Sequence, residues 1–116
     1  MKEIVLIIRP EKLEEVKTIL DNNQYGGLTI SSVMGCGSQK GQMEHAINEI
    51  KGMKTVINLL PKIRVEVVVS DNHVEDLILE LCEKLRTGHV GDGKLFIRDI
   101  EQTVRIRTGE RGDRAL

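Results

Sequence analysis

The chain has 116 residues, of which 30% are charged, but 17 basic residues nearly balance 18 acidic ones and leave a formal net charge of −1. This length predicts one domain or one internally repeated unit, and the lack of a basic excess argues against a protein that binds nucleic acid. No apolar run approaches the length that spans a membrane, no signal-peptide pattern is present, and Cys36 and Cys82 lack the spacing of metal ligands, so we expect a cytoplasmic protein with reduced thiols.

The first third of the chain predicts a strand, a helix and a second strand. Residues 2–9 form a short run rich in β-branched residues that ends at Pro10, which is typical of a strand buried on both faces. Residues 10–20 begin with proline and acidic residues and carry one apolar stripe, which favours an amphipathic helix. After the break at NNQYGG, residues 28–35 predict the second strand.

The middle of the chain, residues 36–62, reads as a long polar loop. Loops of this length usually have a function. Apolar residues between 42 and 51 follow a helical spacing, so we expect a transient amphipathic helix there and a variable position of residues 42–58 without a partner. The alternative is that this stripe packs against its own subunit.

The last half of the chain repeats the pattern of strand, helix and strand. Residues 63–70 alternate apolar and polar side chains, and residues 71–88 carry a second helical stripe with Gly88 as a plausible stop. Residues 94–100 and 102–112 then read as strands. Two halves of this kind predict an α+β, ferredoxin-like split β-α-β sheet with both helices on one face.

The sequence GHVGDGK, which ends at Lys94, suggests an anion site. Glycines let backbone N–H groups approach an anion, and Lys94 adds a positive charge. The motif is not a Walker A sequence, because Leu95 occupies the Ser/Thr position. The alternative is a helix end followed by a tight turn. Arg105 and Arg107, two apart on an expected strand, favour a phosphate clamp over a solvated sheet edge, so we expect a nucleotide polyphosphate to bind here.

Other polar residues give weaker signals. Gln39 could ligate a metal ion, and Lys40 and Lys62 could pair with carboxylates or phosphates, although such residues also keep loops soluble. The three histidines show no metal-ligand spacing, and no pair of nucleophile and base is visible.

The chain as a whole resembles the P-II nitrogen regulatory proteins. The resemblance covers residues 1–116 and is most specific at LLPKIRVEVVV, RTGHVGDGKLFI and VRIRTGERGDRAL. It implies a homotrimer of ferredoxin-like subunits that binds ATP or ADP in three clefts between subunits, and 2-oxoglutarate beside Mg²⁺. It also implies a signal transducer rather than an enzyme, which reports to target proteins through a long T-loop, here about residues 37–58.

The same resemblance implies roles for single residues. Gly91, Asp92, Gly93 and Lys94 would cradle the phosphates, with Arg105 and Arg107 on the other side of the cleft. Ile7, Thr29, Gly35 and Val68 match positions around the adenine and ribose. Gln39 matches the residue that touches Mg²⁺ and 2-oxoglutarate, and Lys62 the residue that pairs with a 2-oxoglutarate carboxylate. Ser38 and Lys40 complete the expected binding positions at the start of the T-loop.

The T-loop departs from the family pattern. Ser38 stands where the family commonly has a phosphate-binding arginine, residues 42–58 are longer than usual, and they contain neither tyrosine nor serine. Uridylylation or serine phosphorylation of this loop is therefore not expected. The pattern fits P-II proteins that regulate nitrogenase in nitrogen fixation, with an ammonium transporter or glutamine synthetase as other targets. The alternative function is a small nucleotide- or phosphate-handling enzyme on the same sheet, which would use Lys94 and the arginines.

Overall fold

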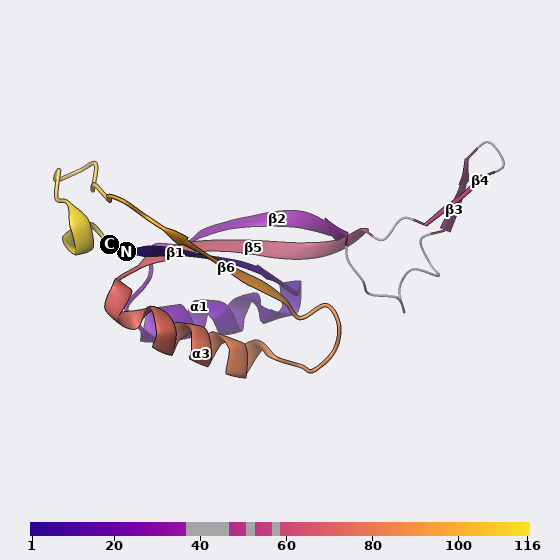
Figure 1. Cartoon of the computed structure of the whole chain (residues 1–116), viewed down its shortest axis with the longest axis horizontal. Helices are drawn as coiled ribbons and strands as arrows, with labels where there is room; N and C mark the ends of the chain where they lie inside the picture. Colours follow the sequence, from indigo (N-terminus) through magenta and orange to yellow (C-terminus); the bar gives the residue numbers. More distant parts are fainter. Residues whose placement is uncertain (37–46, 51–52, 57–58) are drawn as a thin grey trace.

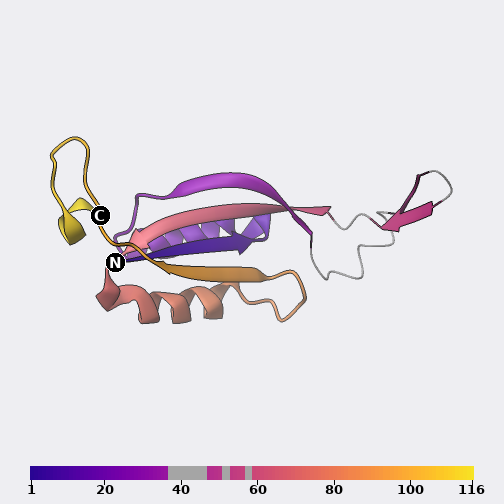
Figure 2. The ribbon, with the colours of Figure 1, turned by 45° about the horizontal axis from the view of Figure 1, so that its top comes forward.

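The computed structural model describes residues 1–36, 47–50, 53–56 and 59–116. Side chains are described for residues 1–36 and 59–116 only. Four strands form one antiparallel sheet in the order β2-β5-β1-β6. Both helices lie on the same face of this sheet (Figures 1 and 2). The strands are β1 (Lys2–Ile8), β2 (Thr29–Cys36), β5 (Leu59–Val69) and β6 (Gly93–Asp99), and the helices are α1 (Leu13–Asn22) and α3 (Val74–Leu85).

The strand order confirms the predicted ferredoxin-like fold. Each helix leads from one sheet strand to another, and the two β-α-β halves interleave so that β5 and β1 occupy the centre of the sheet. Short 3-10 turns precede both helices, η1 (Pro10–Lys12) and η3 (Asp71–His73), and a third, η4 (Gly112–Ala115), lies near the C-terminus. Pro10 suits the first of these turns because a missing N–H costs nothing at a helix start.

The core lies between the sheet and the two helices. Alternate residues of the central strands point into it, and the predicted helical stripes cover them. Its buried members are Ile4, Leu6 and Ile8 of β1, Val65, Val67 and Val69 of β5, Val16, Ile19 and Leu20 of α1, and Val74, Leu77, Leu81 and Leu85 of α3.

The opposite face of the sheet is covered by no helix among the residues that the structure describes. Strand β1 is buried on this side only at Val5, which is 2% exposed, whereas the neighbouring Phe96 is half exposed. The prediction that the first strand is buried on both faces therefore holds for its middle alone.

The sequence missed several boundaries. The predicted stop at Gly88 is wrong, because α3 ends at Leu85 where Arg86 turns extended with φ −69° and ψ 126°. Strand β5 begins at Leu59, four residues before the alternating pattern, and passes through Pro61. Proline is tolerated there because β5 pairs only with β2 at that level, as an edge pair.

The expected strand at residues 102–112 is also wrong. Apart from a single bridge between Val104 and Arg111, these residues form a turn in which Gly109 N donates to Arg105 O at 2.7 Å. Glycines at positive φ, such as Gly109 at +73°, allow the chain to reverse. Arg105 and Arg107 therefore do not share one face of a strand.

The described part of the long loop forms a small hairpin. β3 (Ile47–Ile50) pairs with β4 (Met53–Val56), so the predicted helix over 42–51 is wrong for the residues that are described. The other residues of that prediction, 42–46 and 51, lie outside the described residues, as does the expectation of a variable loop position.

Candidate functional site

The segment between α3 and β6, residues 86–92, is held together by the Asp92 carboxylate. Asp92 accepts hydrogen bonds from the Thr87 hydroxyl, from Thr87 N at 2.8 Å and from Gly88 N at 3.1 Å. These bonds, the hydroxyl first, and the nearby Arg9 guanidinium lower the pKa of Asp92 far below its ordinary range. Its carboxylate oxygens are thus occupied by the loop itself, which makes this carboxylate an organiser of the loop.

Gly93 is required by the approach of a neighbouring strand. Its φ is +103°, and a Cβ at this position would lie 1.8 Å from the carbonyl oxygen of Ile7. No side chain fits this space. Strand β1 therefore fixes the end of the loop, with Ile7 opposite Lys94 and Ile8 opposite Gly93 in the ladder.

Two cations bind successive carbonyl groups of this loop. Arg9 Nη2 donates to Val90 O at 2.8 Å, and Lys62 Nζ donates to Gly91 O at 2.7 Å. Lys62 is only 9% exposed, and its burial, together with the nearby Arg9 charge, lowers the pKa of its ammonium group. A negative group placed beside Lys62 would favour the charged ammonium and so oppose this lowering of its pKa.

Gly35 makes room for the Lys62 side chain. A Cβ on Gly35 would lie 3.1 Å from Lys62 Cγ, since the two residues are on paired strands β2 and β5. The structure thus brings together, at one end of the sheet, seven of the residues that the sequence singled out: Ile7, Gly35, Lys62, Gly91, Asp92, Gly93 and Lys94.

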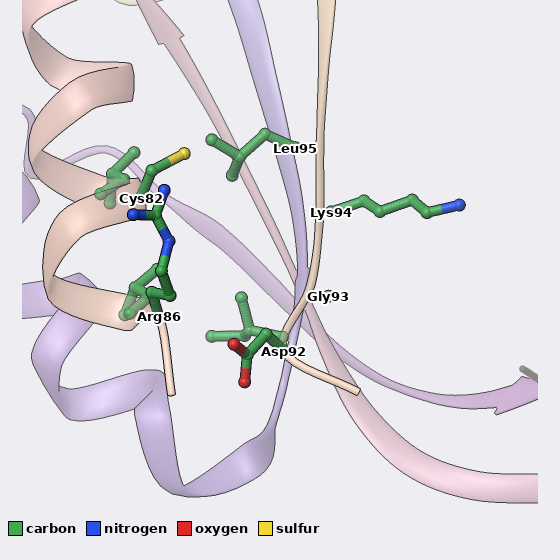
Figure 3. Close-up of a pocket in the computed structure, with 9 residues that line it drawn as sticks. Cys82, Arg86, Asp92, Gly93, Lys94 and Leu95 are labelled. Carbon is green, nitrogen blue, oxygen red and sulfur yellow. The ribbon is translucent and has the colours of Figure 1, made fainter. Parts of the chain in front are cut away.

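Lys94 points away from the helices. Figure 3 shows its side chain on the opposite side of β6 from the hollow of about 160 Å³ that Leu95, Cys82 and Arg86 help to line. The ladder agrees, because Lys94 pairs with Ile7, whose neighbours Leu6 and Ile8 face the core. The ammonium group of Lys94 is therefore on the face of the sheet that no described helix covers.

A second group of predicted residues lines a larger hollow of about 500 Å³. Thr29, Val68 and Arg105 border it, together with Tyr25 and Glu66. Arg105 Nη1 lies 3.3 Å from Glu110 Oε1, so the turn itself holds the guanidinium. Arg107 is exposed in the same turn and does not border the hollow.

The two groups lie at different ends of the sheet. Along β1, Ile7 is opposite Lys94, whereas Glu3 is opposite Val68. Four residues of strand separate these levels, a distance of roughly 13 Å. Arg105 lies farther still, since the chain reaches it only after β6 has run past Lys2 (Figure 1). One copy of the chain therefore does not bring the glycine loop and the arginine turn to the same place.

Three of the predicted ligands, Ser38, Gln39 and Lys40, lie outside the described residues. Within the parts of the chain that are described, no three His, Cys, Asp or Glu side chains cluster as metal ligands do, and no helix has the length and apolar character needed to cross a membrane. The residue that sequence reasoning missed is Arg9, and its only signal was a basic residue at the end of the first strand.

Fold and site together define a ferredoxin-like α+β domain with basic side chains gathered around a glycine loop at one end of its sheet. The family model described as nitrogen regulatory protein P-II matches residues 1–110, and the chain belongs to this family. P-II proteins are regulatory signalling proteins, so the chain is a nitrogen-regulatory signal transducer and not an enzyme.

Curated relatives support the assignment over the whole chain. The nitrogen regulatory protein P-II of Microchaete diplosiphon is 46% identical over 116 residues, which is all of both chains. That of Nostoc punctiforme is 45% identical over the same full lengths. The nitrogen regulatory protein P-II 2 of Methanothermobacter thermautotrophicus is 46% identical over all of this chain and 97% of its own.

Proposed function

We propose that this P-II protein binds ATP or ADP between subunits of a homotrimer, senses 2-oxoglutarate with Mg²⁺, and controls target proteins through its T-loop. The observation that carries the proposal is the separation of the two predicted half-sites. The glycine loop with Lys94 and the hollow beside Arg105 each hold part of a nucleotide site, and they lie at different ends of one sheet. Two subunits packed side by side would join them across one cleft.

The glycine loop suits phosphate groups. Within the described parts of the chain, the N–H group of Gly91 donates to no protein acceptor, while the carbonyls of Val90 and Gly91 are bound by Arg9 and Lys62. Backbone N–H groups left free in a turn are common anion ligands. Lys94 adds a mobile cation on the neighbouring strand. The adenine and ribose would then contact Ile7 and Gly35 of one subunit and the hollow of the neighbouring subunit.

The uncovered face of the sheet supports association of subunits. Apolar side chains such as Val5, Phe96 and Val68 share it with the ion pair of Arg64 and Glu66, whose Nε and Oε1 atoms are 2.8 Å apart. A small domain buries little apolar surface on its own, so covering this face with two further copies would add to a modest core.

Lys62 is suited to a dicarboxylate effector. The residue is only 9% exposed, and burial lowers the pKa of its ammonium group, so a carboxylate of 2-oxoglutarate placed beside it would favour the charged form. Gln39 is the proposed partner of Mg²⁺, with Ser38 and Lys40 beside it. A dianion bound at the base of the T-loop would favour some loop conformations over others through its differential contacts.

The targets that we propose are nitrogenase, an ammonium transporter or glutamine synthetase, reached in the cytoplasm. The alternative of a nucleotide- or phosphate-handling enzyme has no support in the family.

Calorimetry tests the proposal directly. Titration with ATP and Mg²⁺ should give one site per chain, and 2-oxoglutarate should bind only when ATP and Mg²⁺ are present. Light scattering at micromolar concentration should give three times the mass of the chain. A monomer, or a trimer that retains no nucleotide, would contradict the proposed function.

A further inference from the structure

Arg9 reaches the glycine loop from the far end of the first strand. The residue lies where β1 ends, immediately before Pro10, and its side chain is 19% exposed. Its Nη2 atom donates to Val90 O at 2.8 Å, and its Nε atom lies 3.4 Å from Asp92 Oδ1. One planar guanidinium thus contacts both the middle of the loop and the carboxylate that closes it.

These contacts determine the direction of a peptide group. In a trans peptide the carbonyl and the following N–H point to opposite sides. Because Arg9 holds the carbonyl of Val90, the N–H of Gly91 must point away from Arg9. Lys62 acts in the same way on the next peptide, where it holds the carbonyl of Gly91 and turns the N–H of Asp92 away.

We propose that Arg9 is a positioning residue for the phosphate site: it orients the Gly91 N–H toward the anion without touching the anion itself. This inference rests on the proposed nucleotide binding and assigns to Arg9 the alignment of that site. The glycine needs such support because Gly91 has φ +105°, and glycine adopts many conformations at little cost. Without a restraint on the Val90 carbonyl, the peptide could turn and lose the aligned donor.

A comparison of four variants tests this role. Arg9→Gln removes the charged guanidinium and its several N–H donors, whereas Arg9→Lys keeps the charge but offers a single ammonium group. Arg86→Gln is the matched control, since Arg86 begins the same segment and its side chain turns toward the hollow beside Cys82 (Figure 3). Lys94→Ala removes the cation proposed to contact phosphate.

The first measurement needs no nucleotide. Amide NMR of the ligand-free protein should show that Arg9→Gln shifts the signals of Gly91 and Asp92 well beyond the shifts caused by Arg86→Gln, while thermal unfolding shows both variants folded. Unchanged Gly91 and Asp92 signals in Arg9→Gln would overturn the proposal, whether or not the protein binds ATP.

The second measurement separates positioning from direct contact. ATP affinity should fall about tenfold in Arg9→Gln, be partly restored in Arg9→Lys and stay unchanged in Arg86→Gln. The dependence of affinity on ionic strength should weaken more in Lys94→Ala than in Arg9→Gln, because a cation in direct contact with the phosphates interacts with them more strongly than one held behind the loop. A salt dependence weakened as much in Arg9→Gln as in Lys94→Ala would mean that Arg9 contacts the phosphates, which contradicts a positioning role. A wild-type protein that binds no ATP would refute the proposed function. The amide shifts would still show whether Arg9 orients the Gly91 peptide.

Discussion

Lys62 and Gly91 are 29 positions apart in the sequence, yet the ammonium group of Lys62 donates a 2.7 Å hydrogen bond to the carbonyl of Gly91. The bond links the base of the T-loop, where β5 begins, to the loop that we propose as the phosphate site. A ligand carboxylate that attracts Lys62 must compete with this bond. The pair therefore gives the proposed effector a direct physical connection to the nucleotide site.

The first prediction concerns this pair. Lys62→Met keeps the length of the side chain but removes the charge, so binding of 2-oxoglutarate should weaken tenfold or more, about the loss of one charge-assisted hydrogen bond. ATP alone should lose less affinity, because Arg9 and Asp92 still hold the loop. Calorimetry with and without 2-oxoglutarate measures both, and Lys17→Met on the exposed face of α1 is the control. Equal losses for ATP and 2-oxoglutarate would argue against a separate effector role.

The second prediction concerns Gly93. Gly93→Ala should lower the free energy of unfolding by about 3 kcal/mol or more, because the new Cβ would clash with the Ile7 carbonyl at a positive φ. Gly26→Ala, which meets no atom within 4 Å, should change it by less than about 0.5 kcal/mol. Chemical denaturation compares the two, and similar stabilities would show that β1 and β6 do not approach this closely.

The third prediction concerns pH. The folded protein holds the pKa of Asp92 far below the ordinary value of 3.8, mainly through the Thr87 hydroxyl. Asp92 therefore adds stability that is complete above about pH 4 and is lost as pH falls toward its folded pKa. Asp92→Asn should unfold at a lower temperature than the wild type near neutral pH.

The difference in melting temperature between the wild type and Asp92→Asn should shrink below pH 4. Thr87→Val, which removes the main hydrogen-bond donor to Asp92, should reproduce part of the loss and should not add fully to Asp92→Asn in the double variant. A difference that stays constant between pH 6 and pH 2.5 would contradict the network.

The fourth prediction concerns the two proposed phosphate contacts. Lys94→Ala and Arg105→Ala should each weaken ATP binding by about tenfold or more, since a hydrogen bond to a charged group contributes roughly 1.5–3 kcal/mol. Calorimetry on the folded variants measures the change. Wild-type affinity in both variants would place the phosphates elsewhere.

Periodicity predicted much of the fold from the sequence. The alternation in β5 and the helical stripes of α1 and α3 reappear as the core, because burial enforces both patterns. The turn around Arg105 was missed because Val104 and Ile106 alternate as in a strand, although Ile106 is fully exposed. A local pattern carries no information about which partner strand is present. Among the described residues, the segment beyond Asp99 pairs with no strand and makes only the bridge between Val104 and Arg111.

The candidate site was only partly predictable. The GDGK sequence indicated the glycine loop. Glycine is required at position 93, however, because the Ile7 carbonyl lies where a side chain would be, and these two residues are 86 positions apart in the sequence. Asp92 was expected to help cradle phosphates, and the sequence did not indicate that its carboxylate closes its own loop through Thr87. The role of Arg9 depends on a long-range bond to Val90 that no spacing in the sequence encodes.

The central claim is that each nucleotide site is shared between two subunits, and mixing two inactive variants tests it most directly. Lys94→Ala and Arg105→Ala are co-expressed with different tags, and trimers that carry both tags are isolated and titrated with ATP. If the sites are shared, each trimer that contains both variants has one interface out of three in which an intact Lys94 meets an intact Arg105 of the neighbouring chain, and this interface should bind ATP as the wild type does. If mixed trimers bind no better than either variant alone, both residues act within one chain and the shared site is wrong.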